Sequence, residues 1–300
     1  DILPIRPRMD VDRDYLAHYL LSQRAVDWAA SRTSGANLPR LSPSVLGTMP
    51  VPLPSLPEQR RIASILDQAA AITALRNRAV ELIDAMTGSI FDERFAQLDG
   101  PATRLEELLV DKKDAIRTGP FGSQMLVEEF VDEGVQVLGI DNVRDNVFAG
   151  GSNRHITPQK YRELERYTVL PGDVLITIMG TVGRVCVVPE GIPLSISSKH
   201  LCALTLRRDQ VLPEYIQAYV LNHPRARLHL NQTQKGAIMA GLNMSIIKDL
   251  PVIVPSLSEQ KRFVADLATV GAIRDQAMLH HDQIRLLADS LATRAFKGEL

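Results

Sequence analysis

Side chains that could hold phosphate groups gather in one part of this 300-residue chain. Residues 151–250 carry 12 basic and 7 acidic side chains, whereas residues 101–150 carry 5 basic and 10 acidic ones. The basic stretch also contains four histidines: His155, His200, His223 and His229. Because the whole chain has a formal net charge of −1, this local excess of positive charge predicts a phosphate-facing surface on an otherwise neutral protein.

The sequence lacks the motifs of the common enzyme classes. It has no GxxxxGKS or GxxxxGKT loop, no GxGxxG fingerprint and no HExxH, GxSxG or EF-hand pattern. It also has no NPPY-type tetrapeptide of amino-methyltransferases and no nuclease-like carboxylate cluster. The only cysteines, Cys186 and Cys202, form no CxxC pair, which argues against a zinc site. We therefore expect a non-catalytic protein with no metal and no cofactor of its own.

Length and composition predict a globular protein of about two domains. Hydrophobic residues make up 45% of the chain, enough for a sizeable core. No apolar run approaches 18 residues and no signal peptide is visible, so we expect no membrane contact and a cytoplasmic location. The chain begins at Asp1 without methionine, inside what reads as structured sequence, which is typical of a fragment or a trimmed product.

An internal repeat organises the chain. The phrase VPLPSLPEQRRI at 51–62 returns as VIVPSLSEQKRF at 252–263, an offset of 201 residues. Upstream, DYLAHYLL at 14–21 parallels EYIQAYVL at 214–221 with an offset of 200. The matched flanks indicate a duplicated module of about 200 residues whose first copy has lost its beginning.

Each copy of the phrase predicts the start of a long helix. Ser55 with Glu58, and Ser256 with Glu259, have the S-x-x-E spacing of a capping box. After each cap, apolar residues recur at steps near three and four, the period of a coiled-coil seam. The first predicted seam is Ile62, Ile65, Ala69, Ile72, Leu75, Ala79, Leu82, Met86 and Ile90. The second is Phe263, Leu267, Val270, Ile273, Ala277, Ile284, Leu287 and Leu291.

Both helices carry a stripe too apolar for water. Forty residues of helix span roughly 60 Å, and no proline interrupts the first helix before Pro101. Separate burial of two such long helices is the alternative, but the pattern favours an antiparallel pair in which each helix covers the stripe of the other.

Residues 101–254 read as a mixed α/β domain. Strands are predicted at 135–143, at 201–208 and on both sides of a hairpin at 170–188 that turns at Gly180 to Gly183. Short helices are predicted at Glu214–Asn222 and Ser245–Leu250. The expected fold class is therefore α+β, with this domain between two long helices packed as an antiparallel coiled-coil rod.

Several segments together resemble the specificity subunits of type I restriction–modification systems. They are GPFGSQM at 119–125, PGDVLITIMGTVGRV at 171–185, GLNMSIIKDLPVIVPSLSEQKRF at 241–263 and the twin phrase at 50–62. The resemblance covers essentially the whole chain. Its most specific element is the proline-rich phrase that runs into a long helix, which occurs twice.

The resemblance implies a non-catalytic DNA-binding scaffold. Each target-recognition domain would read half of a bipartite site on double-stranded DNA, and the helical rod would fix the unread spacer between the halves. Methyltransferase subunits would dock on the scaffold and supply the S-adenosylmethionine chemistry. A restriction subunit that translocates DNA would join for cleavage, so ATP and Mg²⁺ would also belong to partner subunits.

The resemblance implies four segments, one of which departs from the family pattern. Residues 55–98 and 255–300 would be the two conserved spacer helices, and 101–254 a complete recognition domain. Residues 1–54 would be only the C-terminal remnant of a first recognition domain, which puts a bipartite target in doubt for this chain alone. The alternatives are a truncated scaffold that binds methyltransferase subunits without reading DNA, two self-paired copies that read an interrupted palindrome, and an unrecognised enzyme.

The loops of residues 101–254 supply the candidate DNA contacts. Arginine suits guanine and asparagine suits adenine, whereas lysine and bare backbone amides suit phosphates. The candidates are Ser123, Gln124, Asn142, Arg144, Thr181, Arg184, Ser198, Lys199, His200, Lys235 and Gly236. Any one of them alone is more simply a turn or solvated residue, but together they predict a DNA-binding surface.

Four cations in the first turns of the long helices are candidate partner contacts. They are Arg60, Arg61, Lys261 and Arg262. Cations are unfavourable near a helix N-terminus, so DNA phosphates or acidic groups of a methyltransferase subunit would explain them. Solvated charges offset by Glu58 and Glu259 explain them equally well.

Overall fold

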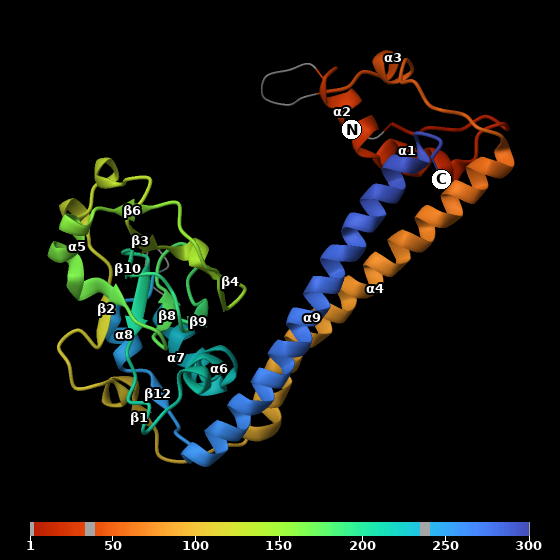
Figure 1. Cartoon of the computed structure of the whole chain (residues 1–300). Helices are drawn as coiled ribbons and strands as arrows, with labels where there is room; N and C mark the ends of the chain where they lie inside the picture. Colours follow the sequence, from red (N-terminus) through yellow and green to blue (C-terminus); the bar gives the residue numbers. More distant parts are fainter. Residues whose placement is uncertain (1–2, 34–39, 235–240, 300) are drawn as a thin grey trace. The chain divides into compact units, whose positions relative to one another are not determined.

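The computed structural model describes residues 3–33, 40–234 and 241–299. The chain divides into two compact units (Figure 1). Unit 1 consists of Asp1–Asp84 with Gly271–Leu300, and unit 2 of Ala85–Val270. This division differs from the predicted segment boundaries because each long helix contributes to both units. The roles assigned to the four segments stay a prediction.

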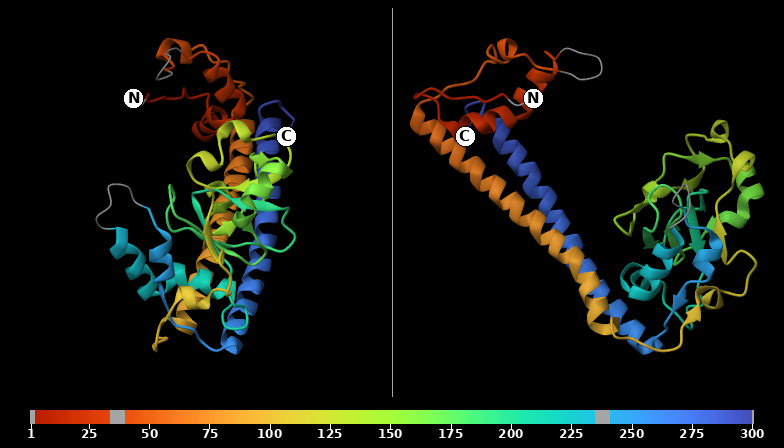
Figure 2. Two further views of the ribbon diagram at one scale, coloured as in Figure 1. Left: turned by 90° about the vertical axis from the view of Figure 1, so that its left-hand side faces the viewer. Right: turned by 180° about the vertical axis from the view of Figure 1, so that it is seen from behind.

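Two long helices run antiparallel to each other. They are α4 (Leu56–Phe95) and α9 (Leu257–Ala295). In unit 1, Arg274 donates to the Asp84 carboxylate at 2.6 Å, and in unit 2 the rings of Phe91 and Phe263 lie 5.9 Å apart. Within unit 1, α4 contacts α9 through Asp84 with Arg274 and, further back along α4, through Ile62 in one buried cluster with Ala295, so the two segments run in opposite directions and lie side by side in both views of Figure 2. The predicted antiparallel pair is confirmed.

The seam between the helices differs from the predicted one. In unit 1, α4 buries Ile62 and Leu66, whereas the predicted seam residues Ile72, Leu75 and Leu82 are 48%, 71% and 54% exposed. Three further predicted seam residues are exposed: Met86, Ile273 and Leu287. The helices carry more apolar side chains than a single seam can hold, so part of the predicted seam forms a second stripe that faces solvent.

The two helix starts use their glutamates differently. In the second copy, Ser256 N donates to Glu259 at 3.0 Å and Glu259 N donates to the Ser256 hydroxyl at 3.4 Å, which is the predicted capping box. In the first copy, Glu58 instead accepts two hydrogen bonds from Arg61, at 2.9 and 2.8 Å. The predicted capping box is therefore formed at the start of α9 but not at the start of α4.

The small helices of unit 1 are fixed by side-chain caps. They are α1 (Arg13–Leu21), α2 (Gln23–Ala30) and α3 (Pro43–Leu46). The caps are Asp12, Ser22 and Ser42, each of which accepts from backbone amides of the first turn. Short polar residues thus start three helices that would be marginal on their own.

Two tyrosines of α1 form the centre of the unit 1 core. Both are buried, and the Tyr15 hydroxyl donates to the Pro52 carbonyl at 2.8 Å while the Tyr19 hydroxyl donates to the Pro50 carbonyl at 2.5 Å. Phe296, just beyond the end of α9, lies edge-on to both rings at 5.5 and 5.2 Å. The end of the second long helix therefore completes the core around the first copy of the repeat.

Unit 2 repeats this arrangement with the helices exchanged. The Tyr215 hydroxyl donates to the Ile253 carbonyl at 2.6 Å, and the Tyr219 hydroxyl donates to the Pro251 carbonyl at 2.9 Å. Here the edge-on phenylalanine is Phe95, which ends α4 and lies 5.2 Å from the ring of Tyr215. The core of each repeat copy is thus completed by the end of the long helix that starts in the other copy: α9 completes the first core, and α4 completes the second.

Two larger sheets form the body of unit 2 in the described part of the chain. The first has the antiparallel order β2-β11-β8-β9, and the second has the order β6-β3-β10-β7 with β3 and β10 parallel. The strands of the first sheet are β2 (Ile116–Thr118), β8 (Val174–Thr177), β9 (Val185–Val187) and β11 (Leu201–Leu204). Those of the second are β3 (Val135–Leu138), β6 (His155–Ile156), β7 (Thr168–Val169) and β10 (Ser195–Ser197).

Strand pairs and short helices surround the sheets. The pairs are β1 (Thr103–Arg104) with β12 (Pro251–Val252), and β4 (Val143–Arg144) with β5 (Val147–Phe148). The helices are α5 (Pro158–Leu164), α6 (Pro213–Asn222), α7 (Pro224–Gln234) and α8 (Met244–Lys248). The mixture of helix and sheet confirms the α+β class, and β8 and β9 form the predicted glycine-turned hairpin.

Candidate nucleic-acid interface

A shallow hollow in unit 2 collects several of the predicted DNA contacts. It is called here the hairpin hollow, encloses about 370 Å³ and is lined by Ile140, Asp141, Arg144, Asp145, Thr181 and Arg184. Arg144 comes from β4, Asp145 from the turn that follows it, and Thr181 and Arg184 from the glycine turn between β8 and β9. The fold therefore brings together three candidates from two separate hairpins, β4–β5 and β8–β9.

The β4–β5 hairpin holds its turn in a left-handed conformation. Asp145 and Asn146 have φ angles of 48° and 62°, the pattern of a two-residue type I′ turn. The Asn146 amide oxygen accepts from Val185 N at 3.0 Å, and its backbone carbonyl accepts from the Gln217 amide at 2.6 Å. The hairpin is therefore bound to β9 and α6, and its tip presents Arg144 and Asp145 in a fixed place.

A second hollow lies beside the glycine–proline loop at 119–122. It is called here the loop hollow, encloses about 240 Å³ and has the polar lining residues Arg154, Ser198, Lys199 and His200. Its apolar lining residues include Met125, Val127, Phe130 and Val137. An apolar lining with a few polar groups is the composition of many ligand sites.

Glycine is required where the loop meets the end of β10. A Cβ atom at Gly119 would lie 2.1 Å from the Ser197 carbonyl oxygen, closer than any real contact. The absence of a side chain lets this loop pack on the backbone that leads to Ser198, whose side chain is buried, and to exposed Lys199. The predicted polar trio at 198–200 thus lies against the predicted glycine–proline loop.

Positive charge dominates the loop hollow. The pKa of His200 is lowered, first by burial and then by the charges of Lys199 and Arg154. Arg154 also donates to the Asp141 carboxylate at 2.5 Å, and Asp141 lines the hairpin hollow. This ion pair joins the two hollows into one candidate interface, and Arg154, Asp141 and Asp145 are the residues that the sequence interpretation missed.

Gln124 and Asn142 have structural partners. The Gln124 amide oxygen accepts from Phe121 N at 3.1 Å and from the Tyr167 hydroxyl at 3.0 Å, while neighbouring Ser123 is exposed. Asn142 is buried, and its amide closes the 3₁₀ turn that begins after Gly139. This turn also ends the predicted strand at 135–143 early, because β3 stops at 138.

Asn142 is therefore a correction to the predicted DNA contacts. Its amide oxygen accepts from Gly139 N at 2.9 Å, and its amide nitrogen donates to the carbonyls of Ala149 and Gly151 at 2.8 and 2.6 Å. A buried amide that is bonded in this way stabilises the loop and does not reach a groove. Two further candidates, Lys235 and Gly236, lie outside the described residues.

The four cations at the helix starts fall into two pairs. In unit 1, Arg61 binds Glu58, and Arg60 Nε lies 3.8 Å from the Asp12 carboxylate. In unit 2, Lys261 and Arg262 are exposed. The Glu58 pair offers an internal reason for Arg61, and partner binding by all four stays a prediction.

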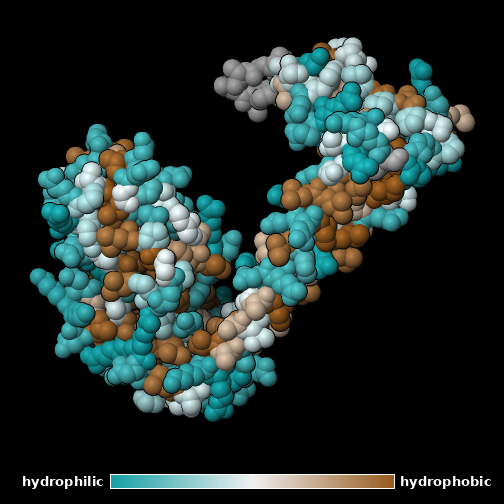
Figure 3. Space-filling model, viewed as in Figure 1, coloured by the Kyte–Doolittle hydropathy of each residue, from teal (hydrophilic) through white to brown (hydrophobic). Residues whose placement is uncertain are grey.

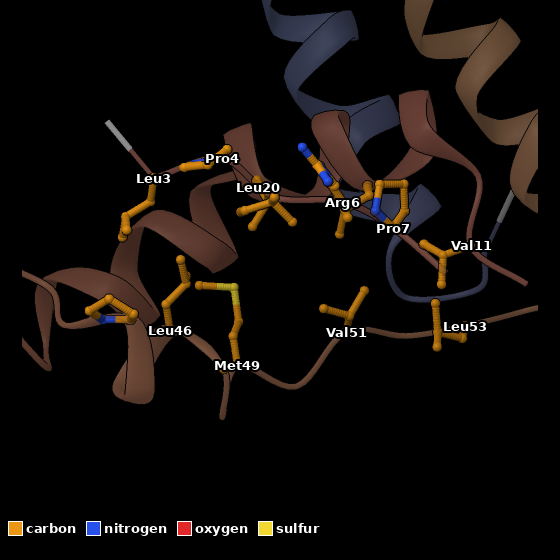
Figure 4. A pocket seen from close by; sticks show the side chains of 14 residues that line it. Leu3, Pro4, Arg6, Pro7, Val11, Leu20, Leu46, Met49, Val51 and Leu53 are labelled. Atoms are coloured by element: carbon orange, nitrogen blue, oxygen red, sulfur yellow. The ribbon is translucent and has the colours of Figure 1, made fainter. Parts of the chain in front are cut away.

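Unit 1 has an open apolar groove where unit 2 is closed. The groove encloses about 490 Å³, and among its half-buried lining residues are Leu16, Leu20, Leu46, Met49 and Val51 (Figure 4). The corresponding residues of the second copy are buried in the unit 2 core: Ile216, Val220, Ile247, Leu250 and Val252. In unit 2 the cover comes from the α/β body, through residues such as Leu105 and Leu204.

The described part of the chain contains neither a metal-binding cluster nor a membrane-spanning helix. No group of three or more His, Cys, Asp or Glu side chains within it could hold a metal ion. Likewise, none of its helices is both long and apolar enough to cross a membrane.

The chain belongs to a family of DNA specificity proteins. The family model for the type I restriction modification DNA specificity domain matches residues 1–84 and 134–278. The chain is 24% identical to the specificity subunit of the type I restriction enzyme StySPI of Salmonella potsdam, over 99% of this chain and 67% of that protein. It is also 24% identical to the EcoBI specificity subunit of Escherichia coli, over 90% of this chain and 62% of that protein. The chain thus spans about two thirds of the length of these relatives.

Solved structures share the fold. One, described in work on complex assembly and conformational transition of the type I R-M system, matches with a TM-score of 0.62 at 19% identity, over 98% of this chain and 73% of that one. The type I restriction-modification S subunit of M. genitalium matches with a TM-score of 0.52 at 15% identity, over 96% of this chain and 73% of that one. These likenesses show that the architecture of the chain is that of S subunits.

Proposed function

We propose that this chain is the non-catalytic DNA-specificity subunit of a type I restriction–modification complex and acts in the cytoplasm. The observation that carries the proposal is the pair of hollows in unit 2, joined by the Asp141–Arg154 ion pair. Several separate loops contribute donors, acceptors and cations to this one surface. Base edges and phosphates need such a mixture of groups.

The long helices support a scaffold role. In the unit 1 segments, α4 exposes Ile72, Leu75 and Leu82, and α9 exposes Leu279 and Leu286. The apolar surface along both helices is visible in Figure 3. Exposed apolar side chains in this number are typical of a surface that a protein partner covers. We propose that methyltransferase subunits bind there, and that these and a restriction subunit bring S-adenosylmethionine, ATP and Mg²⁺.

The open groove of unit 1 bears on the number of recognition domains. Its residues Leu16, Leu46 and Val51 are half-buried, whereas their repeat counterparts lie in the closed core of unit 2. We propose that a second α/β body, resembling the one in unit 2, covers the groove in the working complex. The complex would then read two half-sites, of which the domain at 101–254 reads one.

Methylation mapping in cells tests the proposed function. The chain is co-expressed with its cognate methyltransferase subunit, and modified adenines or cytosines are located across the host genome. We expect a defined motif, and a motif with two separated parts would also support the second body. A complex that assembles and methylates without sequence preference would refute the proposal.

A scaffold that does not read DNA is the second candidate. It is favoured by the apolar groove of unit 1, which no α/β body covers within the described part of the chain. In that case the chain and the methyltransferase subunit copurify, but no methylation appears in the mapping experiment. A double variant that replaces Leu75 and Leu279 by serine is expected to weaken copurification in either case, because both residues belong to the exposed helix surface.

A further inference from the structure

The two hollows of unit 2 differ in their balance of charge. The lining of the loop hollow includes the cations Arg154 and Lys199, beside His200. The hairpin hollow is lined by two arginines and two aspartates, together with Ile140 and Thr181. The formal charges of the hairpin hollow therefore cancel, whereas those of the loop hollow do not.

This difference separates phosphate binding from base reading. A phosphate is held by cations and N–H groups, and two carboxylates in the same hollow would repel it. A base pair in the major groove instead presents acceptors and donors side by side. The mixed lining of the hairpin hollow, with Arg144 and Asp145 at the hairpin tip, suits base edges.

Existing contacts determine which groups a base pair could reach. The carboxylate of Asp141 already accepts from Arg154 at 2.5 Å. Asp145 is exposed and, within the described part of the chain, takes part in no ion pair. Arg144 is exposed and donates through Nε to the Asp141 carbonyl at 3.0 Å, which restrains its guanidinium plane, while its two terminal nitrogens have no hydrogen-bond partner in the described part of the chain. Arg144 is therefore an oriented hydrogen-bond donor, and the Asp145 carboxylate beside it is an available acceptor.

The hairpin holds this pair in a rigid arrangement. Two consecutive non-glycine residues with positive φ are uncommon, and Asp145 occupies a position where glycine or asparagine would be less strained. The bonds of Asn146 to Val185 and Gln217 stabilise the turn from behind. Groups held in place before binding lose little entropy when they meet a ligand.

We infer that the hairpin hollow reads one G·C base pair in the major groove of the DNA target. The terminal nitrogens of Arg144 donate to guanine O6 and N7, and the Asp145 carboxylate accepts from the exocyclic N4 of cytosine. This inference rests on the proposed function and assigns a chemical target to one part of the surface.

Selection from a pool of random-sequence duplex DNA tests the inference. The chain, bound to its cognate methyltransferase subunit, is compared with variants Asp145→Asn and Arg144→Gln. Asparagine tolerates the left-handed turn at least as well as aspartate does, so Asp145→Asn keeps the hairpin. Asp132→Asn is the matched control, because Asp132 is an exposed aspartate that lines neither hollow.

We expect the parental motif to contain a G·C pair whose preference falls by about tenfold in both hollow variants. The other positions of the motif are expected to stay, and Asp132→Asn to select the parental motif. Two results would overturn the inference but leave the proposed function standing. One is a parental motif that lacks this G·C pair, and the other is a set of variants that select the whole parental motif, whatever their affinity. A parental complex that selects no motif would overturn the proposed function as well.

Discussion

Gln59 and Gln260 make the same three hydrogen bonds in the two units of the molecule. Each amide oxygen accepts, at 2.8 Å, from the backbone N–H of the residue before a tyrosine-bearing helix, Asp12 or Leu212. Each amide nitrogen donates to two backbone carbonyls at 2.9 and 3.1 Å. Both side chains are buried. The glutamine of the repeated phrase therefore links the start of each long helix to the segment that begins α1 or α6 by hydrogen bonds.

We expect Gln260→Leu to destabilise unit 2 by about 3 kcal/mol. Leucine fills the same volume but leaves buried backbone groups, including Leu212 N, without a partner. Urea unfolding followed by circular dichroism measures the loss. Gln283→Leu is the control, because Gln283 is exposed on the same helix. Equal losses in the two variants would contradict the structural role of Gln260.

The two phenylalanines at the helix ends give a reciprocal prediction. Phe296→Ala should loosen α1, because Phe296 packs on Tyr15 and Tyr19. Phe95→Ala should loosen α6, because Phe95 packs on Tyr215. Each change is expected to cost about 3–5 kcal/mol. Amide hydrogen exchange should become faster in α1 for Phe296→Ala and in α6 for Phe95→Ala. Faster exchange in the same helix for both variants would contradict the arrangement in which each long helix completes the core of the other repeat copy.

Acid should destabilise the chain through His223. Burial lowers the pKa of this histidine, which stacks on Tyr219 at 4.3 Å. Below about pH 6.5 the unfolded chain binds a proton that the folded chain resists, so stability falls as the pH drops through that range. Thermal unfolding at about pH 7 and about pH 5 should show a smaller loss for His223→Gln than for the parental chain. An equal loss in the two chains would contradict this role of His223.

The two cysteines should be unreactive in the folded chain. Burial raises the pKa of both Cys186 and Cys202 to about 12, and both side chains are fully buried. Only the thiolate attacks an alkylating agent. Iodoacetamide at mildly alkaline pH should therefore modify neither cysteine until urea unfolds unit 2, as mass spectrometry would reveal. Rapid modification of Cys202 in the native chain would show that the first sheet opens readily.

Lys199 should contribute to affinity and not to sequence preference. It is exposed and lines the loop hollow, where a phosphate would lie. We expect Lys199→Gln to reduce the slope of log affinity against log salt by about one while the motif stays the same. Lys113→Gln removes an exposed lysine outside both hollows and should leave the slope unchanged. An unchanged slope for Lys199→Gln would remove this lysine from the interface.

The internal repeat made the architecture predictable, because two similar sequences at 51–62 and 252–263 predict the same local structure independently. The capping box at Ser256 and Glu259, the long helices and the hairpin at 170–188 all follow from local patterns. The seam was less predictable because α4 carries neighbouring apolar stripes. Sequence spacing alone did not decide whether Leu66 or Ile72 would be buried.

The candidate site was only partly predictable because tertiary contacts determine which polar residues are available. Asn142 and Arg144 both follow a strand in the sequence, yet one is buried and the other exposed. Arg154 carried no local signal, since its neighbour β6 is two residues long. It meets Asp141 only because β6 pairs with β3. The Asp145–Asn146 turn was the one missed feature with a recognisable sequence signature.

The exchange of helix ends has a consequence for how the protein is made. Tyr15 meets Phe296 across about 280 residues of chain. A ribosome adds about 5–20 residues per second, so roughly 15–60 s pass between the two during synthesis. Unit 2 lies between them in the sequence and can complete its core first, because Phe95 precedes Tyr215. Of the two units, the one that begins earlier in the sequence can therefore complete its core only after the other, and its aromatic side chains must stay protected from aggregation until Phe296 emerges.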